Sequence, residues 1–131
     1  MSDIKSENSG YTEEEEKAKL TEARRKMAEY LYTEIMPNIR SRIEIGWGKT
    51  TYGGGESVKQ WRIIIYPDEL FMCCDFGADR VLPDGTFKER PLFPNNMTEQ
   101  CMLHWTDIKR KCLDEVDKCK AYKHTLDTFT V

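Results

Sequence analysis

The chain has 131 residues, of which 39% are hydrophobic and 33% are charged, and its formal net charge is −3. This length and composition are typical of a globular protein, so we expect a single domain over residues 1–131. The negative charge argues against general nucleic-acid binding, which needs a basic surface. No apolar run approaches the ~20 residues that span a bilayer, so we expect no membrane association.

The N-terminal segment and the cysteines both favour a cytoplasmic protein. Residues 1–10 are polar and lack the apolar core of a secretory signal, and residues 1–11 are expected to form a flexible tail. The cysteines number five, an odd count, and none forms a Cys-x-x-Cys pair. We therefore expect reduced thiols that serve as small core residues.

A long helix is predicted to begin at Thr12, which forms a capping box with Glu15. The acidic run Glu13–Glu16 suits the positive end of the helix dipole, and we prefer this interpretation to mimicry of DNA charge. The apolar residues that follow at helical spacing are Leu20, Ala23, Met27, Leu31 and Ile35. Pro37 is expected to end or kink this helix near Ile35.

The middle of the chain predicts an antiparallel sheet of three to five strands. Alternating apolar residues indicate a strand over 43–47, a second over 58–66 and a third over 70–76 that Gly77 ends. Gly53–Gly55 predicts a flexible loop between the first two. Pro83-Asp84-Gly85 predicts a turn that joins 80–82 and 86–88 in a short hairpin.

A second long helix is predicted over about 97–124, capped by Asn96 with Glu99. Its apolar seam consists of Cys101, Trp105, Ile108, Cys112, Val116 and Cys119. Because such a helix exceeds what a domain of this size needs, we expect part of the seam to bury against a second copy in a homo-oligomer. The predicted fold is therefore α+β, with an antiparallel sheet packed against an N-terminal helix and a long C-terminal helix.

Catalytic and metal motifs are sparse. The Gly-Lys-Thr at 48–50 lacks the earlier glycine of a phosphate loop and does not enter a helix, so that interpretation fails. Cys101 and His104 have the spacing of two zinc ligands, with Cys73 or Cys74 as a third, but we prefer a core cysteine beside a rim histidine, because structural zinc sites normally come with Cys-x-x-Cys knuckles. We expect no cofactor and no metal.

Cations beside apolar or aromatic edges are the more informative set. Arg24 borders the first helical stripe, Arg62 lies on the strand face opposite Trp61, and His104 and Lys111 fall along one rim of the C-terminal seam. Arginine matches the geometry of phosphate, and Phe76 or Tyr66 offers a ring on which a base can stack. Each cation alone is better explained by a stem lying over apolar surface, whereas the set together, near a glycine-rich loop, suggests a ligand site.

This order of elements resembles the first described family of phage-encoded Thoeris anti-defence sponges. The resemblance rests on the acidic-capped first helix, the glycine-interrupted sheet, the segment Cys74–Arg80 and a cation-bearing last helix that starts near Thr98. It implies an oligomer in the cytoplasm of an infected bacterium. Such a protein binds a cyclic ADP-ribose isomer, and in some members a cyclic oligonucleotide, without cleaving it.

The resemblance also implies roles for particular residues. Phe76 would stack on the base, and Asn95 or Asn96 would bind a ribose or a base edge. Arg62, Arg110 and Lys111 would bind the phosphates, although Lys109-Arg110-Lys111 departs from a pair of arginines one turn apart.

Two other functions compete with sequestration of a nucleotide. One is an inhibitor that binds a protein of a bacterial defence complex through its acidic N-terminal face, as anti-CRISPR proteins do. The other is a small nucleotide-processing enzyme with Asp107 or His104 as general base.

Overall fold

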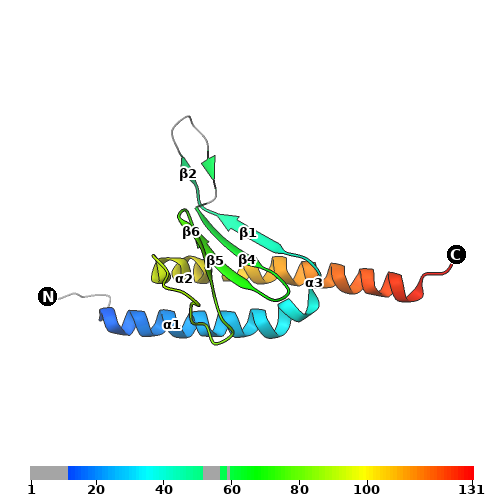
Figure 1. Ribbon diagram of the computed structural model, residues 1–131, viewed down its shortest axis with the longest axis horizontal. Helices are drawn as coiled ribbons and strands as arrows, with labels where there is room; N and C mark the ends of the chain where they lie inside the picture. Colours follow the sequence, from blue (N-terminus) through cyan, green and yellow to red (C-terminus); the bar gives the residue numbers. More distant parts are fainter. Residues whose placement is uncertain (1–11, 52–56, 59) are drawn as a thin grey trace.

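The computed structural model describes residues 12–51, 57–58 and 60–131. The predicted tail at 1–11 and the glycine triplet at 53–55 lie outside these residues. The α+β prediction is confirmed, because α-helices pack on one face of an antiparallel sheet (Figure 1). Within the described residues, no helix combines the length and the hydrophobicity that crossing a membrane requires.

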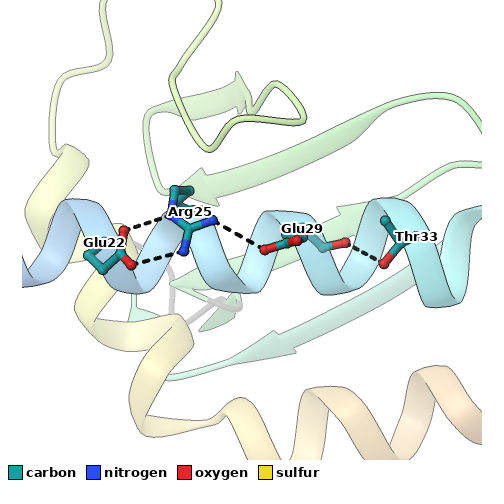
Figure 2. Close-up of polar contacts among 4 residues, drawn as sticks. All are labelled: Glu22, Arg25, Glu29 and Thr33. Atoms are coloured by element: carbon teal, nitrogen blue, oxygen red, sulfur yellow. Dashed lines mark hydrogen bonds and ion pairs between the residues drawn. The ribbon is translucent and has the colours of Figure 1, made fainter.

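The first helix, α1 (Glu13–Tyr30), starts with the predicted capping box. The Glu15 amide donates to Thr12 Oγ1 at 3.1 Å, and the Thr12 amide donates to Glu15 Oε1 at 3.2 Å. These bonds satisfy amide groups that the first helical turn leaves free. One side of α1 is buried through Met27, while Arg25 on the exposed side bridges Glu22 and Glu29 (Figure 2).

The first helix ends in a π-helical turn, which the sequence did not predict. A π-helical turn, η1 (Leu31–Ile35), follows α1, and a short 3₁₀ turn, η2 (Met36–Asn38), contains Pro37. The predicted end near Ile35 is thus confirmed. The wide turn changes the helical phase, so that Leu31, Ile35 and Met36 are all buried.

The main sheet has the strand order β1-β4-β5-β6. Its strands are β1 (Ile43–Trp47), β4 (Trp61–Ile65), β5 (Leu70–Cys74) and β6 (Gly77–Arg80). The predicted alternation is confirmed: Ile63 and Ile65 face the helices and are fully buried, whereas Arg62 lies on the opposite face. The core therefore lies between this inner face and the three α-helices.

Two strand predictions were wrong in their bounds. Residues 58–66 do not form one strand, because β3 (Ser57–Val58) pairs with β2 (Thr50–Thr51) in a separate sheet and the chain bends at Gln60 before β4. The third strand ends at Cys74, since Asp75 and Phe76 form a turn. Gly77, with φ of 150°, then starts β6 instead of ending β5.

The predicted hairpin at 80–88 is confirmed by an antiparallel bridge between Val81 and Phe87. Asp84 Oδ1 accepts bonds from the amide and the hydroxyl of Thr86 at 3.0 and 2.6 Å. Gly85 has φ of 87°, and a β-carbon there would lie 2.5 Å from the Cα atom of Arg25. The tip of the hairpin therefore packs directly on the backbone of α1.

The prediction of one continuous C-terminal helix was wrong. The chain forms α2 (Pro94–Leu103) and α3 (Trp105–Thr128), which are separated by His104 with φ −108° and ψ 14°. α2 begins at Pro94, whose fixed φ suits the first position of a helix, so the predicted capping box of Asn96 and Glu99 does not form.

The predicted seam is covered mainly by the chain itself. Cys101, Ile108, Cys112 and Val116 are buried in the common core, and Trp105 and Cys119 pack against it. Beyond Cys119 the helix runs past the sheet (Figure 1), and Tyr122, Leu126 and, directly after the helix, Phe129 are exposed. The homo-oligomer remains a prediction, and most of the seam is already occupied.

Candidate functional site

A pocket of about 210 Å³, which we call the aromatic pocket, lies between the end of β5 and the start of α2. It is lined by Gln60, Trp61, Cys74, Asp75, Phe76, Phe93 and Asn96. Three aromatic rings with two side-chain amides give it an apolar body and polar edges. This combination is typical of sites that hold one small, flat group.

Two exposed phenyl rings, those of Phe76 and Phe93, are part of its lining. Phe76 is held in the two-residue turn between β5 and β6 and is 74% exposed, and Phe93 directly precedes α2 and is 40% exposed. The ring centroids lie 5.9 Å apart with an angle of 41° between the planes. Leu92, the chain neighbour of Phe93, is also 70% exposed. Large apolar groups gathered in this way mark interaction sites more often than scattered ones do.

The polar groups of the pocket can form hydrogen bonds with the edge of a ligand. The amides of Gln60 and Asn96 each offer donors and an acceptor, and Asp75 offers carboxylate oxygens. Asn95 and Asn96 also lie in the first turn of α2, where no acidic side chain and no side-chain cap is present. Backbone amides at a helix start favour negative charge nearby.

The predicted site residues are only partly brought together. Phe76 and Asn96, assigned to stacking and to a base or ribose edge, line the same pocket. Asn95 is the chain neighbour of Asn96 and is half-buried. The three predicted phosphate ligands, Arg62, Arg110 and Lys111, do not line it.

These three cations lie on other parts of the surface. Arg62, on the outer face of β4, lies 3.9 Å from a carboxylate oxygen of Glu44. It also lies near the Cys73 thiol, where burial raises the pKa to about 11 although Arg62 opposes the shift. Arg110 is exposed on α3 and forms an ion pair with Asp107 at 2.9 Å. Their charges are therefore matched within the chain.

Lys111 lines a second hollow, of about 410 Å³, between β1 and α3. We call it the charged groove. Its charged residues are Arg42, Glu44, Lys111, Asp114, Glu115 and Lys118. The cations and the anions are equal in number, so the groove has no net charge to attract a phosphate.

Arg24 is part of the core. Its Nε donates to the carbonyl of Gly85 at 2.6 Å, its Nη1 donates to Thr98 Oγ1 at 2.9 Å, and its guanidinium lies 4.6 Å from the ring centre of Phe87. Burial lowers the pKa of Arg24, although an arginine remains charged at neutral pH. The side chain ties α1 to the hairpin and to α2 and does not line the aromatic pocket, so its ligand role stays a prediction without support from this geometry.

His104 marks the break between α2 and α3. Its ring stacks on Trp47 with 4.8 Å between centroids, and its Nδ1 lies 3.2 Å from the carbonyl of Gln100. The indole of Trp47 donates to the side chain of Gln100 at 3.1 Å. This cluster joins the end of β1 to α2 and does not line the aromatic pocket.

The zinc alternative lacks support in the described part of the chain, where no three His, Cys, Asp or Glu side chains gather as metal ligands do. The buried Cys101 thiol has its pKa raised to about 12 by desolvation. A thiol of that kind resists the deprotonation that zinc ligation requires.

Sequence reasoning missed Phe93, Gln60 and Trp61 as members of the pocket. Phe93 precedes Pro94, and an exposed aromatic residue next to a helix start was the available signal. Residues 58–66 were predicted as one strand, whereas the chain bends at Gln60 and β4 begins at Trp61, and both residues line the pocket.

Comparison with protein-family models, with curated protein sequences and with solved structures found no match for this chain.

Proposed function

We propose that this protein binds and sequesters a small cyclic nucleotide without cleaving it, and that the aromatic pocket holds the base. The observation that carries the proposal is the meeting of Phe76 and Asn96 in one pocket, beside a second exposed ring, Phe93. Stacking on aromatic faces contributes roughly 1–3 kcal/mol per base and tolerates different bases. Amide side chains at the rim add hydrogen bonds to the base edge.

The size of the pocket limits what it takes. At about 210 Å³ it is smaller than sites that enclose a whole drug-sized ligand, so it accepts one ring system and leaves the sugar and phosphates outside. The start of α2 beside Asn96 is the nearest feature that favours an anion. The resemblance to the Thoeris anti-defence sponges makes a cyclic ADP-ribose isomer the first ligand to test.

Two observations bear on the rival functions. Phe76 and Leu92 are 74% and 70% exposed, and such exposed apolar residues are also suited to contact an apolar side chain of a protein partner. The two candidate bases of an enzyme lie outside the pocket, since Asp107 pairs with Arg110 and His104 stacks on Trp47. A protein-binding inhibitor is thus the second candidate.

The proposal is tested by calorimetric titration of the full chain with a TIR-derived cyclic ADP-ribose isomer. Phe76→Ala and Phe93→Ala should each weaken binding about tenfold or more, the loss expected for one stacked base. Phe129→Ala is the matched control, because Phe129 is 71% exposed at the far end of α3 and should bind like the unchanged protein.

Mass spectrometry of the ligand released by heating distinguishes the functions. Intact ligand supports sequestration, and cleaved ligand supports an enzyme. Absence of binding, or equal affinity in all three variants, contradicts the pocket assignment and favours a search for a protein partner.

A further inference from the structure

The aromatic pocket combines three rings with a single charge. Its rings are those of Trp61, Phe76 and Phe93, and among the described residues that line it Asp75 alone is charged. The face of an aromatic ring attracts a positive charge that lies within about 6 Å of the ring centre, and Trp is the most effective ring. A carboxylate attracts the same kind of group. This lining therefore favours a positively charged ligand group over an anionic one.

Two of the rings are placed so that one group can contact both. The centroids of Phe76 and Phe93 lie 5.9 Å apart with their planes inclined by 41°. A positive charge held in the pocket beside this pair is within reach of each ring. Because both rings are partly in water, the half-buried Trp61 is expected to contribute the strongest attraction.

Trp61 is held in place by the fold. It starts β4, and its side chain packs against the core. The backbone of Gly48, which has φ of 74°, lies so close that a β-carbon there would be 3.1 Å from Cδ1 of Trp61. A ring that is already fixed loses little conformational freedom when a ligand binds.

The polar groups of the lining distinguish a charged base from a simple ammonium group. A quaternary ammonium has no N–H and no carbonyl, so the amides of Gln60 and Asn96 would gain no hydrogen bond from it. The edge of a nucleobase offers them donors and acceptors. The carboxylate of Asp75 accepts N–H donors, and its two oxygens have about four acceptor sites, enough for a ligand and a neighbour in the chain together.

We infer that the aromatic pocket selects a nucleotide whose base carries a positive charge, because a ring nitrogen of the base is alkylated. This selectivity rests on the proposed function, to which it adds the chemical class of the base. Such a base uses the rings, the carboxylate and the amides at once. The phosphate lies outside the pocket, toward the start of α2, where backbone amides favour negative charge.

The test is a calorimetric titration of the full chain at mildly acidic pH with three nucleotides. These are guanosine monophosphate, 7-methylguanosine monophosphate, whose base is positively charged, and the 7-methyl-7-deaza analogue, which has the same added methyl group without the charge. The charged nucleotide should bind at least about tenfold more tightly than guanosine monophosphate, as expected for a cation on partly desolvated rings. The neutral analogue should bind like guanosine monophosphate.

Three variants assign this preference to the pocket. Asp75→Asn keeps the size of the side chain and removes its charge, and Phe93→Leu replaces a ring by an aliphatic chain. Each should lower the ratio of the two affinities, charged over uncharged guanosine nucleotide, at least about threefold. Asp79→Asn is the matched control and should keep the ratio, because Asp79 is also half-buried but does not line the pocket.

The outcomes separate this selectivity from the proposed function. Equal affinity for the charged nucleotide and its neutral analogue overturns the selectivity and leaves the proposed function standing. Binding of a cyclic ADP-ribose isomer without binding of either guanosine nucleotide does the same. Phosphocholine that binds as tightly as 7-methylguanosine monophosphate would show recognition of an ammonium group without a base, and would overturn the selectivity too. If none of these ligands binds, the proposed function fails as well.

Discussion

Arg24 and Phe76 each lie in the environment that their chemistry disfavours. The guanidinium of Arg24 is buried, with 7% of the residue exposed, whereas the phenyl ring of Phe76 is 74% exposed. The buried cation has a structural explanation, because two hydrogen bonds and an aromatic ring compensate for the loss of water. Among the described residues, the Phe76 ring lies beside the ring of Phe93, which is itself exposed, and most of its surface remains in water.

The difference separates two kinds of unusual residue. A polar group inside the fold is held by its partners, and removing it should affect folding. An apolar group outside the fold forgoes roughly 1.5–3 kcal/mol of burial, and removing it should affect binding instead. The following predictions test this division, in order of decreasing effect.

The largest effect is expected where the hairpin meets α1. Gly85→Ala should destabilise the protein by at least about 3 kcal/mol, because the new β-carbon would lie 2.5 Å from the Arg25 Cα atom at a φ of 87°. Gly77→Ala is the control, since its φ is 150° but nothing lies within 4 Å of the added carbon, and about 1 kcal/mol is expected. Urea unfolding measures both, and equal losses would contradict the close packing.

Arg24→Met should cost about 2–3 kcal/mol, because the buried carbonyl of Gly85 loses its donor. The neighbouring Arg25→Met should cost much less than Arg24→Met, although Arg25 forms more ion pairs (Figure 2), because those pairs are exposed to solvent. Urea unfolding of both variants checks this ranking. A reversed order would show that the exposed pairs stabilise the fold more than the buried bonds do.

The buried thiols predict a loss of stability in alkali. Burial raises the pKa of Cys101 and of Cys112 to about 12, above the value of ~8.5 for a free thiol. Their contribution is fully present below pH ~8.5 and declines as the pH rises toward 12, because the unfolded chain releases these protons first. Between pH 7 and pH 10.5, the urea concentration at the unfolding midpoint should fall less steeply with pH in Cys101→Ala than in the unchanged protein. An equal slope in the variant and the unchanged protein would contradict the assignment of this pH dependence to the Cys101 thiol.

The smallest effect on stability is expected at Phe76. Phe76→Ala should change the free energy of unfolding by less than about 0.5 kcal/mol, because the ring is mostly in water. Thermal unfolding beside Phe129→Ala provides the comparison. A loss above 1 kcal/mol would mean that Phe76 supports the β5–β6 turn, and the effect of this variant on ligand binding would then need a milder substitution such as Phe76→Leu.

The parts of the fold that depend on local chemistry were predictable. Thr12 with Glu15, the alternation around Ile63 and the turn at Pro83–Gly85 each specify their structure within a few residues. The break at His104 was not predictable from spacing, because the apolar positions of α2 and α3 keep a helical period across it.

The site was predictable only in part, because its members come from distant segments. Phe76 and Asn96 carry the chemistry that suggested a ligand, and the fold brings them together. The fate of Arg24 depends on Gly85 and Thr98, which lie 61 and 74 residues away, and no local pattern encodes those bonds. Arg24 and Arg62 both lie beside apolar residues in the sequence, yet Arg24 is buried in the core and Arg62 lies on the outer face of the sheet.

The π-helical turn η1 has a consequence for the length of the chain. A π turn accommodates one residue more than an α-helical turn while the segments on either side keep their places. Thr33 lies exposed within it, with its hydroxyl on the Glu29 carbonyl at 2.8 Å (Figure 2). Deleting Thr33 should close the turn to ordinary helix and leave the sheet untouched. Residues 31–35 are therefore where this fold absorbs a one-residue insertion or deletion.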